Sequence, residues 1–73
     1  MARVDKSVIE AALYSWTTLN EAIAEFSEDD TIYAMEVENE REEPRTTFLR
    51  RLRQRLYAIR AEQIRREMEG EGD

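Results

Sequence analysis

Hydrophobic residues recur every three or four positions over the first third of the chain. They are Ile9, Ala12, Trp16, Leu19, Ile23 and Phe26, with Leu13 beside them. This spacing places one side of a helix against a core, so it predicts an amphipathic helix over residues 7–26. Ser7 followed by Glu10 fits the S-x-x-E capping box and predicts where the helix starts. Trp16 belongs to the stripe and is therefore expected in the core.

The hydrophobic residues of the middle segment fall on two faces of a helix rather than one. They are Ile32, Tyr33, Met35 and Val37. Ser27 precedes three acidic residues, which suits an N-cap followed by an acidic first turn, so we predict a helix over residues 28–42. Its orientation stays open: it is either a short helix contacted on both sides or a loosely packed connector.

The last segment carries a clear single stripe. Pro44 disfavours helical geometry at Glu43 and predicts a boundary there. Beyond it, one face of a helix holds Phe48, Leu49, Leu52, Leu56, Ile59 and Gln63. These positions lie within about a third of the helix circumference, which predicts a core-facing helix over residues 47–68. Residues 70–73 are acidic and glycine-containing, so we predict a disordered tail there.

These segments predict an all-α fold with a single helical domain over residues 1–69. We expect the helices 7–26 and 47–68 to pack antiparallel as a helical hairpin, with the short helix 28–42 between them. A chain of 73 residues without cysteine buries only about 60% of its extended surface and has no disulfide to stabilise it. We therefore predict a homodimer that closes into a bundle-like core.

Charge divides sharply at Pro44. Residues 21–43 hold ten carboxylates and one arginine, whereas residues 45–66 hold eight arginines and one glutamate. On the predicted helix the arginines flank the apolar stripe on both sides, where they can pair with the acids of the same chain or of a second copy. The alternative is that they bind the phosphates of nucleic acid. A net charge of −6 and a single lysine weigh against that alternative.

A second, weaker apolar line runs along the last helix, roughly opposite the core stripe. Tyr57, Ala61, Ile64 and Met68 form it, and three arginines border it. A few apolar residues on a surface helix are ordinary, but this composition is also typical of a helix that anchors in a partner's groove. We predict a partner-binding surface made of Arg50, Arg53, Tyr57, Arg60, Ile64 and Met68. Whether it meets a second copy or a foreign protein stays open.

Catalytic and metal-binding chemistry has little to build on. The chain has neither histidine nor cysteine, so the commonest general base and the commonest metal ligands are missing. We predict a non-enzymatic protein with no catalytic, cofactor-binding or metal-binding residues. No apolar run approaches the ~20 residues of a membrane span, and the N-terminal residues lack the apolar region of a signal peptide. We expect a cytoplasmic protein that does not bind membranes.

The second half of the chain carries a family resemblance. It consists of the acid-rich segment Asp30–Glu43, the run Pro44-Arg45-Thr46-Thr47-Phe48-Leu49-Arg50, and the spaced arginines that follow. Over residues 28–67 the chain resembles small helical proteins of tailed bacteriophages, a group that brings no known active site. The resemblance implies a phage or prophage origin, action in the host cytoplasm, and docking on a host or viral protein to redirect it. A nucleic-acid-binding regulator and a structural subunit of a phage particle are the alternatives.

Overall fold

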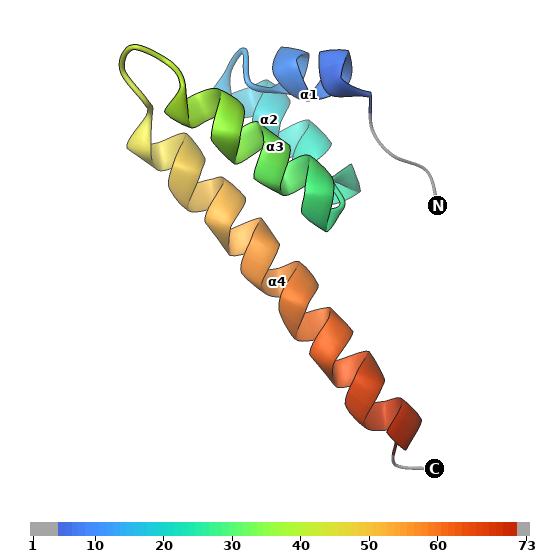
Figure 1. The fold of residues 1–73 in the computed structure, drawn as a ribbon. Helices are drawn as coiled ribbons and strands as arrows, with labels where there is room; N and C mark the ends of the chain where they lie inside the picture. Colours follow the sequence, from blue (N-terminus) through green and yellow to red (C-terminus); the bar gives the residue numbers. More distant parts are fainter. Residues whose placement is uncertain (1–4, 72–73) are drawn as a thin grey trace.

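The protein is all-α, as the sequence predicts. The computed structural model describes residues 5–71, which contain no strand. The elements are α1 (Lys6–Ala12), α2 (Trp16–Ala22), the 3-10 turn η1 (Ile23–Glu25), α3 (Glu28–Asn39) and α4 (Thr46–Glu71). In Figure 1, α3 and α4 run antiparallel as a hairpin, while α1 and α2 lie together at one end of it.

The first predicted helix is broken in the middle. α1 ends at Ala12, and Ser15 caps a new helix. The Ser15 hydroxyl accepts a hydrogen bond from the Thr18 N–H at 3.2 Å, and the Thr18 hydroxyl accepts one from the Ser15 N–H at 2.9 Å. This reciprocal cap satisfies the backbone N–H groups that a new helix start leaves unpaired. The prediction of one helix over residues 7–26 is therefore wrong, as is the predicted Ser7 start, because Asp5 is the N-cap of α1.

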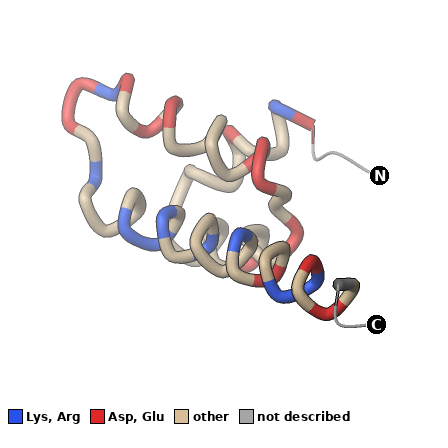
Figure 2. Tube along the Cα trace, turned by 60° about the horizontal axis from the view of Figure 1, so that its bottom comes forward, with Lys and Arg blue, Asp and Glu red and all other residues tan. Residues whose placement is uncertain are grey.

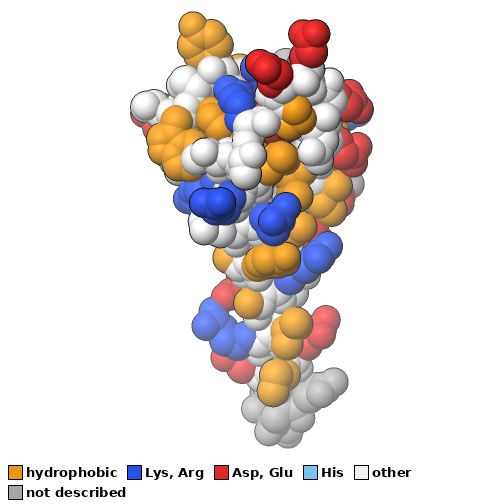
Figure 3. All heavy atoms as spheres, turned by 90° about the vertical axis from the view of Figure 1, so that its left-hand side faces the viewer, with side chains coloured by type: hydrophobic (Ala, Val, Ile, Leu, Met, Phe, Trp, Pro, Cys, Tyr) orange, Lys and Arg blue, Asp and Glu red, His pale blue; other side chains and the backbone are white. Residues whose placement is uncertain are grey.

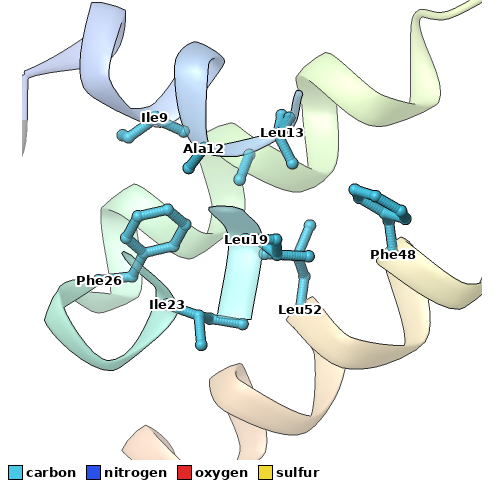
Figure 4. Close-up of a cluster of buried hydrophobic side chains, with 9 residues drawn as sticks. Ile9, Ala12, Leu13, Leu19, Ile23, Phe26, Phe48 and Leu52 are labelled. Carbon is cyan, nitrogen blue, oxygen red and sulfur yellow. The ribbon is translucent and has the colours of Figure 1, made fainter. Parts of the chain in front are cut away.

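The hydrophobic stripe nevertheless forms the core. All its members except Trp16 are buried, and they meet Ala34, Phe48 and Leu52 from the other two helices (Figure 4). Trp16 is 44% exposed, which corrects the expectation that it lies in the core. The reason is the break: Trp16 is the first residue of α2 and lies at the edge of the core. Its ring packs edge-on against Phe48, with centroids 5.6 Å apart.

α3 is a packed helix whose buried face is small and polar. Thr31, Ala34 and Glu38 are fully buried at intervals of three and four residues. The Ser27 cap is confirmed, since its hydroxyl accepts from the Asp30 N–H while the Asp30 carboxylate accepts from the Ser27 N–H. α3 packs along α4 more extensively than any other pair of elements does. The hairpin is therefore α3 with α4, not the first predicted helix with the last.

α4 extends well past the rest of the molecule. At about 1.5 Å per residue, its 26 residues span roughly 39 Å and the 12 residues of α3 roughly 18 Å. The molecule measures 49 × 24 × 20 Å as a result. The core stripe of α4 is buried at Phe48, Leu52 and Leu56, half-buried at Ile59 and exposed at Gln63. The predicted tail begins too early, because α4 continues through Gly70 and Glu71; residues 72–73 lie outside the described part of the chain.

Candidate protein-binding face of helix α4

The charge division at Pro44 becomes a division between neighbouring helices. Figure 2 shows acidic positions along α3 and the loop after it, and basic positions along much of α4. Because the two helices are antiparallel, the blocks lie side by side. The hydrogen bonds and ion pairs that each arginine makes within the chain therefore decide which positive charges remain available to a partner.

Arg45 is committed to a buried ion pair. Its side chain donates from Nη2 to Glu38 Oε1 at 2.7 Å and from Nε to Oε2 at 2.9 Å, and its backbone N–H donates to Oε2 at 2.8 Å. Nη2 also donates to the Leu13 carbonyl at the end of α1 at 2.7 Å. Glu38 is fully buried, and the Arg45 guanidinium covers the Phe48 ring at 3.6 Å. One arginine therefore joins α1, α3 and the start of α4.

Lowering the pH is expected to remove the stability that this ion pair supplies. Burial alone would raise the pKa of Glu38, but hydrogen bonds from the Arg45 side chain and backbone outweigh it and hold the pKa below the usual 4.5. The unfolded chain then takes up the proton at a higher pH than the folded protein, so the free energy of unfolding falls as the pH drops below about 4.5. Urea denaturation of the wild type and Glu38→Gln, from neutral pH to about pH 3, should show their difference shrinking. A difference that is independent of pH would contradict this.

Most of the other arginines of α4 also have partners in the same chain. Arg51 donates to the Asn20 side chain, and Arg55 donates to the carbonyls of Ala24 and Phe26. Arg60 pairs with Glu28 at 3.1 Å, and Glu62 takes both Arg65 and Arg66. The expected pairing with the acids of residues 21–43 thus holds at Arg45 and Arg60. The other paired arginines bind backbone carbonyls, the Asn20 amide or Glu62 of the same helix. In residues 5–71, no hydrogen bond or ion pair engages the side chain of Arg50 or of Arg53.

The second apolar line lies on the exposed side of α4. We call Tyr57, Ala61, Ile64 and Met68 the outer face. Tyr57 is 60% exposed, Ile64 56% and Met68 67%. Figure 3 shows hydrophobic side chains following one another down the projecting end of the molecule, with charged side chains beside them. Between Ala61, Ile64 and Met68 the surface forms a shallow apolar hollow bordered by Arg65 and Glu69.

The six predicted site residues lie together on the exposed side of α4, and Arg60 at its edge pairs with Glu28 at the start of α3. Arg53 and Arg60 lie seven residues apart and flank the outer face, while Arg50 continues its line toward the start of the helix. All three arginines are exposed, and Arg60 keeps its contact with Glu28. Sequence reasoning missed Glu67, which is exposed and follows Arg60 by another seven residues on the same flank. That repeated interval is the signal that could have found it.

A second hollow lies between the start of α3 and residues 55–66 of α4. Its volume is about 680 Å³, and its lining includes Phe26, Ser27, Ala58, Ile59 and Gln63. The charged groups around it already bind one another or the backbone: Arg55 holds the Phe26 carbonyl, and Glu62 holds Arg66. The outer face presents three large apolar side chains that are each more than half exposed, so it is the better candidate for binding.

In residues 5–71 no three acidic side chains come together in a way that could hold a metal ion. Within the same range, no helix combines the length and apolar character needed to cross a membrane. No protein-family model matches the chain, and no curated protein or solved structure matches it at a significant level. The resemblance to phage proteins therefore stays a prediction from the sequence.

Proposed function

We propose that this protein is a non-enzymatic, protein-binding modulator that presents the outer face of α4 to a larger protein. The observation that carries the proposal is the exposure of Tyr57, Ile64 and Met68 in one line on a helix that projects beyond its own core. Aromatic and methionine side chains are enriched at protein interfaces, and a line at intervals of three and four residues is how an amphipathic helix enters a groove.

The bordering charges indicate the chemistry of the partner. Arg50 and Arg53 are exposed and unpaired within the described chain, and both lie beside the outer face. A groove that is apolar at its centre and carboxylate-rich at its rim would match this pattern, because complementary rim charges orient a complex and raise its association rate. Consistent with the phage resemblance, we propose a host or viral protein with such a groove as the partner.

Nucleic-acid binding is less well supported. Six of the eight arginines between Arg45 and Arg66 already donate to groups of the same chain. Two free arginines between residues 45 and 66, in a chain of net charge −6, are few for binding through phosphates, where affinity grows with the number of contacts. No observation favours a structural subunit of a particle over a soluble modulator.

Truncating the outer face is expected to abolish partner capture without unfolding the protein. The variant is Tyr57→Ala with Ile64→Ala, since each removes an exposed anchor and anchors of this kind contribute about 1–2 kcal/mol or more. The matched control is Tyr14→Ala with Val8→Ala, which removes an even more exposed tyrosine and an aliphatic residue elsewhere, at 84% and 49% exposure. The readout is affinity capture from bacterial lysate with quantitative mass spectrometry. Equal capture by both variants would refute the proposal.

A further inference from the structure

The outer face of α4 is self-complementary. Its four residues follow one another at intervals of four, three and four, the spacing of the seam between two supercoiled helices. If two copies of α4 run antiparallel, Tyr57 faces Met68 of the second copy and Ala61 faces Ile64 of the second copy. Every large side chain then meets a smaller or more flexible one, in four consecutive layers.

The flanking charges distinguish the antiparallel arrangement from the parallel one. One flank of the outer face carries Arg53, Arg60 and Glu67 at intervals of seven residues, and the other flank carries Ala58 and Arg65. In an antiparallel pair each flank meets its own equivalent, so Arg60 meets Glu67 of the second copy, twice by symmetry. In a parallel pair the two flanks meet each other, which sets Arg60 against Arg65 of the second copy, also twice. Opposite charges favour the first arrangement and like charges disfavour the second.

The shape of the molecule permits this pairing. The outer face lies roughly opposite the buried stripe of Phe48, Leu52 and Leu56, so the body packs on the other side of α4 and reaches the flank of the outer face only where Glu28 pairs with Arg60. In the antiparallel pair, each body therefore packs on the side of its own α4 that faces away from the second helix. The Glu67 side chain is exposed and forms no hydrogen bond or ion pair within residues 5–71, so it is available. Arg60 is exposed enough to contact a second carboxylate besides Glu28.

We infer that a second copy of this chain occupies the outer face in antiparallel orientation when no larger partner is bound. The inference rests on the proposed function, because it names what covers the same binding face in the free protein. Four layers make a small interface, and small interfaces form weak or transient complexes, so we expect a dissociation constant on the order of tens of micromolar or weaker. Such a dimer hides the apolar anchors from other surfaces and gives them up to a tighter partner.

Charge reversal tests the orientation. Sedimentation equilibrium, over concentrations that bracket this dissociation constant, compares the wild type with Arg60→Glu, Glu67→Arg and the double variant. In the antiparallel dimer each single change turns two attractive contacts into two repulsive ones, so each raises the dissociation constant about tenfold. The double variant restores both pairs and returns to near the wild-type value. In a parallel dimer, Arg60→Glu would instead tighten association by facing Arg65.

Two controls separate this inference from its alternatives. Glu28→Gln removes the intramolecular partner of Arg60 without touching the outer face, and it leaves the dissociation constant unchanged; circular dichroism verifies that each variant is folded. Tighter association of Arg60→Glu, lack of recovery in the double variant, or a wild type that stays monomeric overturns the inference. If the wild type is monomeric and Tyr57→Ala with Ile64→Ala still loses the larger partner, the proposed function stands alone. If the wild type is monomeric and this variant still captures the larger partner, both the dimer and the proposed function are refuted.

Discussion

Replacing Arg45 with methionine is expected to lower the free energy of unfolding by about 3–5 kcal/mol, the usual cost of removing one partner of a buried ion pair. The total free energy of unfolding of a small domain is only about 5–15 kcal/mol, so this variant should be largely unfolded at moderate temperature. The cause is the carboxylate that remains: Glu38 is fully buried and would keep only the backbone N–H at residue 45 as a hydrogen-bond donor, with the exposed Arg41 guanidinium 3.5 Å away. Methionine retains an apolar chain over Phe48, so lost packing contributes little.

A neighbouring arginine provides the matched control. Arg41 lies 3.5 Å from the same Glu38 carboxylate but is 49% exposed. Exposed pairs contribute about 0–1 kcal/mol, so Arg41→Met should leave the thermal and urea midpoints nearly unchanged by circular dichroism. Equal losses in the two variants would show that Arg45 acts through net charge and not through its buried contacts.

The two sides of the pair should also differ from each other. Glu38→Gln leaves an amide oxygen that can still accept from Arg45, and the Arg45 side chain is 27% exposed and can reach water. Its expected cost of about 1–3 kcal/mol is therefore smaller than that of Arg45→Met. Joining the changes as Glu38→Leu with Arg45→Met should recover part of the loss, since apolar replacements of buried pairs are often tolerated. The role of the pair is then to set how α1, α3 and α4 meet.

The buried stripe of the first segment could be predicted because periodicity survives a local break. Ile9 and Ala12 on α1 and Leu19 on α2 all reach the core although Leu13–Ser15 separates the two helices. The break itself follows from hydroxyl groups, since Ser15 and Thr18 satisfy each other's backbone N–H groups. The spacing of hydrophobic residues contains no information on whether these hydroxyl groups cap a new helix or leave one helix continuous.

The orientation of α3 could not be predicted for a different reason. Its buried residues are Asp30, Thr31, Ala34 and Glu38, and three of these are types usually found on surfaces. Thr31 is satisfied by donating to the Ser27 carbonyl at 2.7 Å, and Glu38 by Arg45, which lies seven residues further along the chain. Burial of such groups depends on tertiary partners, so only the folded arrangement reveals the face. The pairing of α3 with α4 was missed as a consequence.

The outer face of α4 was predictable because it is the side of the helix opposite a strong core stripe. The absence of a second helix packed beside it could not be predicted, because that depends on how far α3 extends along α4. α3 has only 12 residues, so the core that covers α4 ends near Ile59 and the helix continues alone. Glu67 can contact a partner only because α4 projects here, where no other element of the same chain covers its side chain.

Replacing Leu52 with alanine is expected to destabilise the protein by about 2–5 kcal/mol, the usual range for a leucine truncated in a core. Leu52 is fully buried, and Figure 4 shows it at the centre of the core, with Leu19 and Ile23 nearby. Its loss leaves a cavity where α4 meets the first helices, and a chain this short has little other core to compensate.

Ile64→Ala is the control on the same helix, because Ile64 is a similar aliphatic residue with 56% of its surface exposed. Its stability should change by no more than about 0.5 kcal/mol, provided that both variants are measured at a concentration too low for association to contribute. The pair of variants separates the two faces of α4: Leu52→Ala should impair folding, whereas Ile64→Ala should impair binding alone. A large loss of stability in Ile64→Ala at low concentration would mean that the outer face is part of the fold and not a surface for partners.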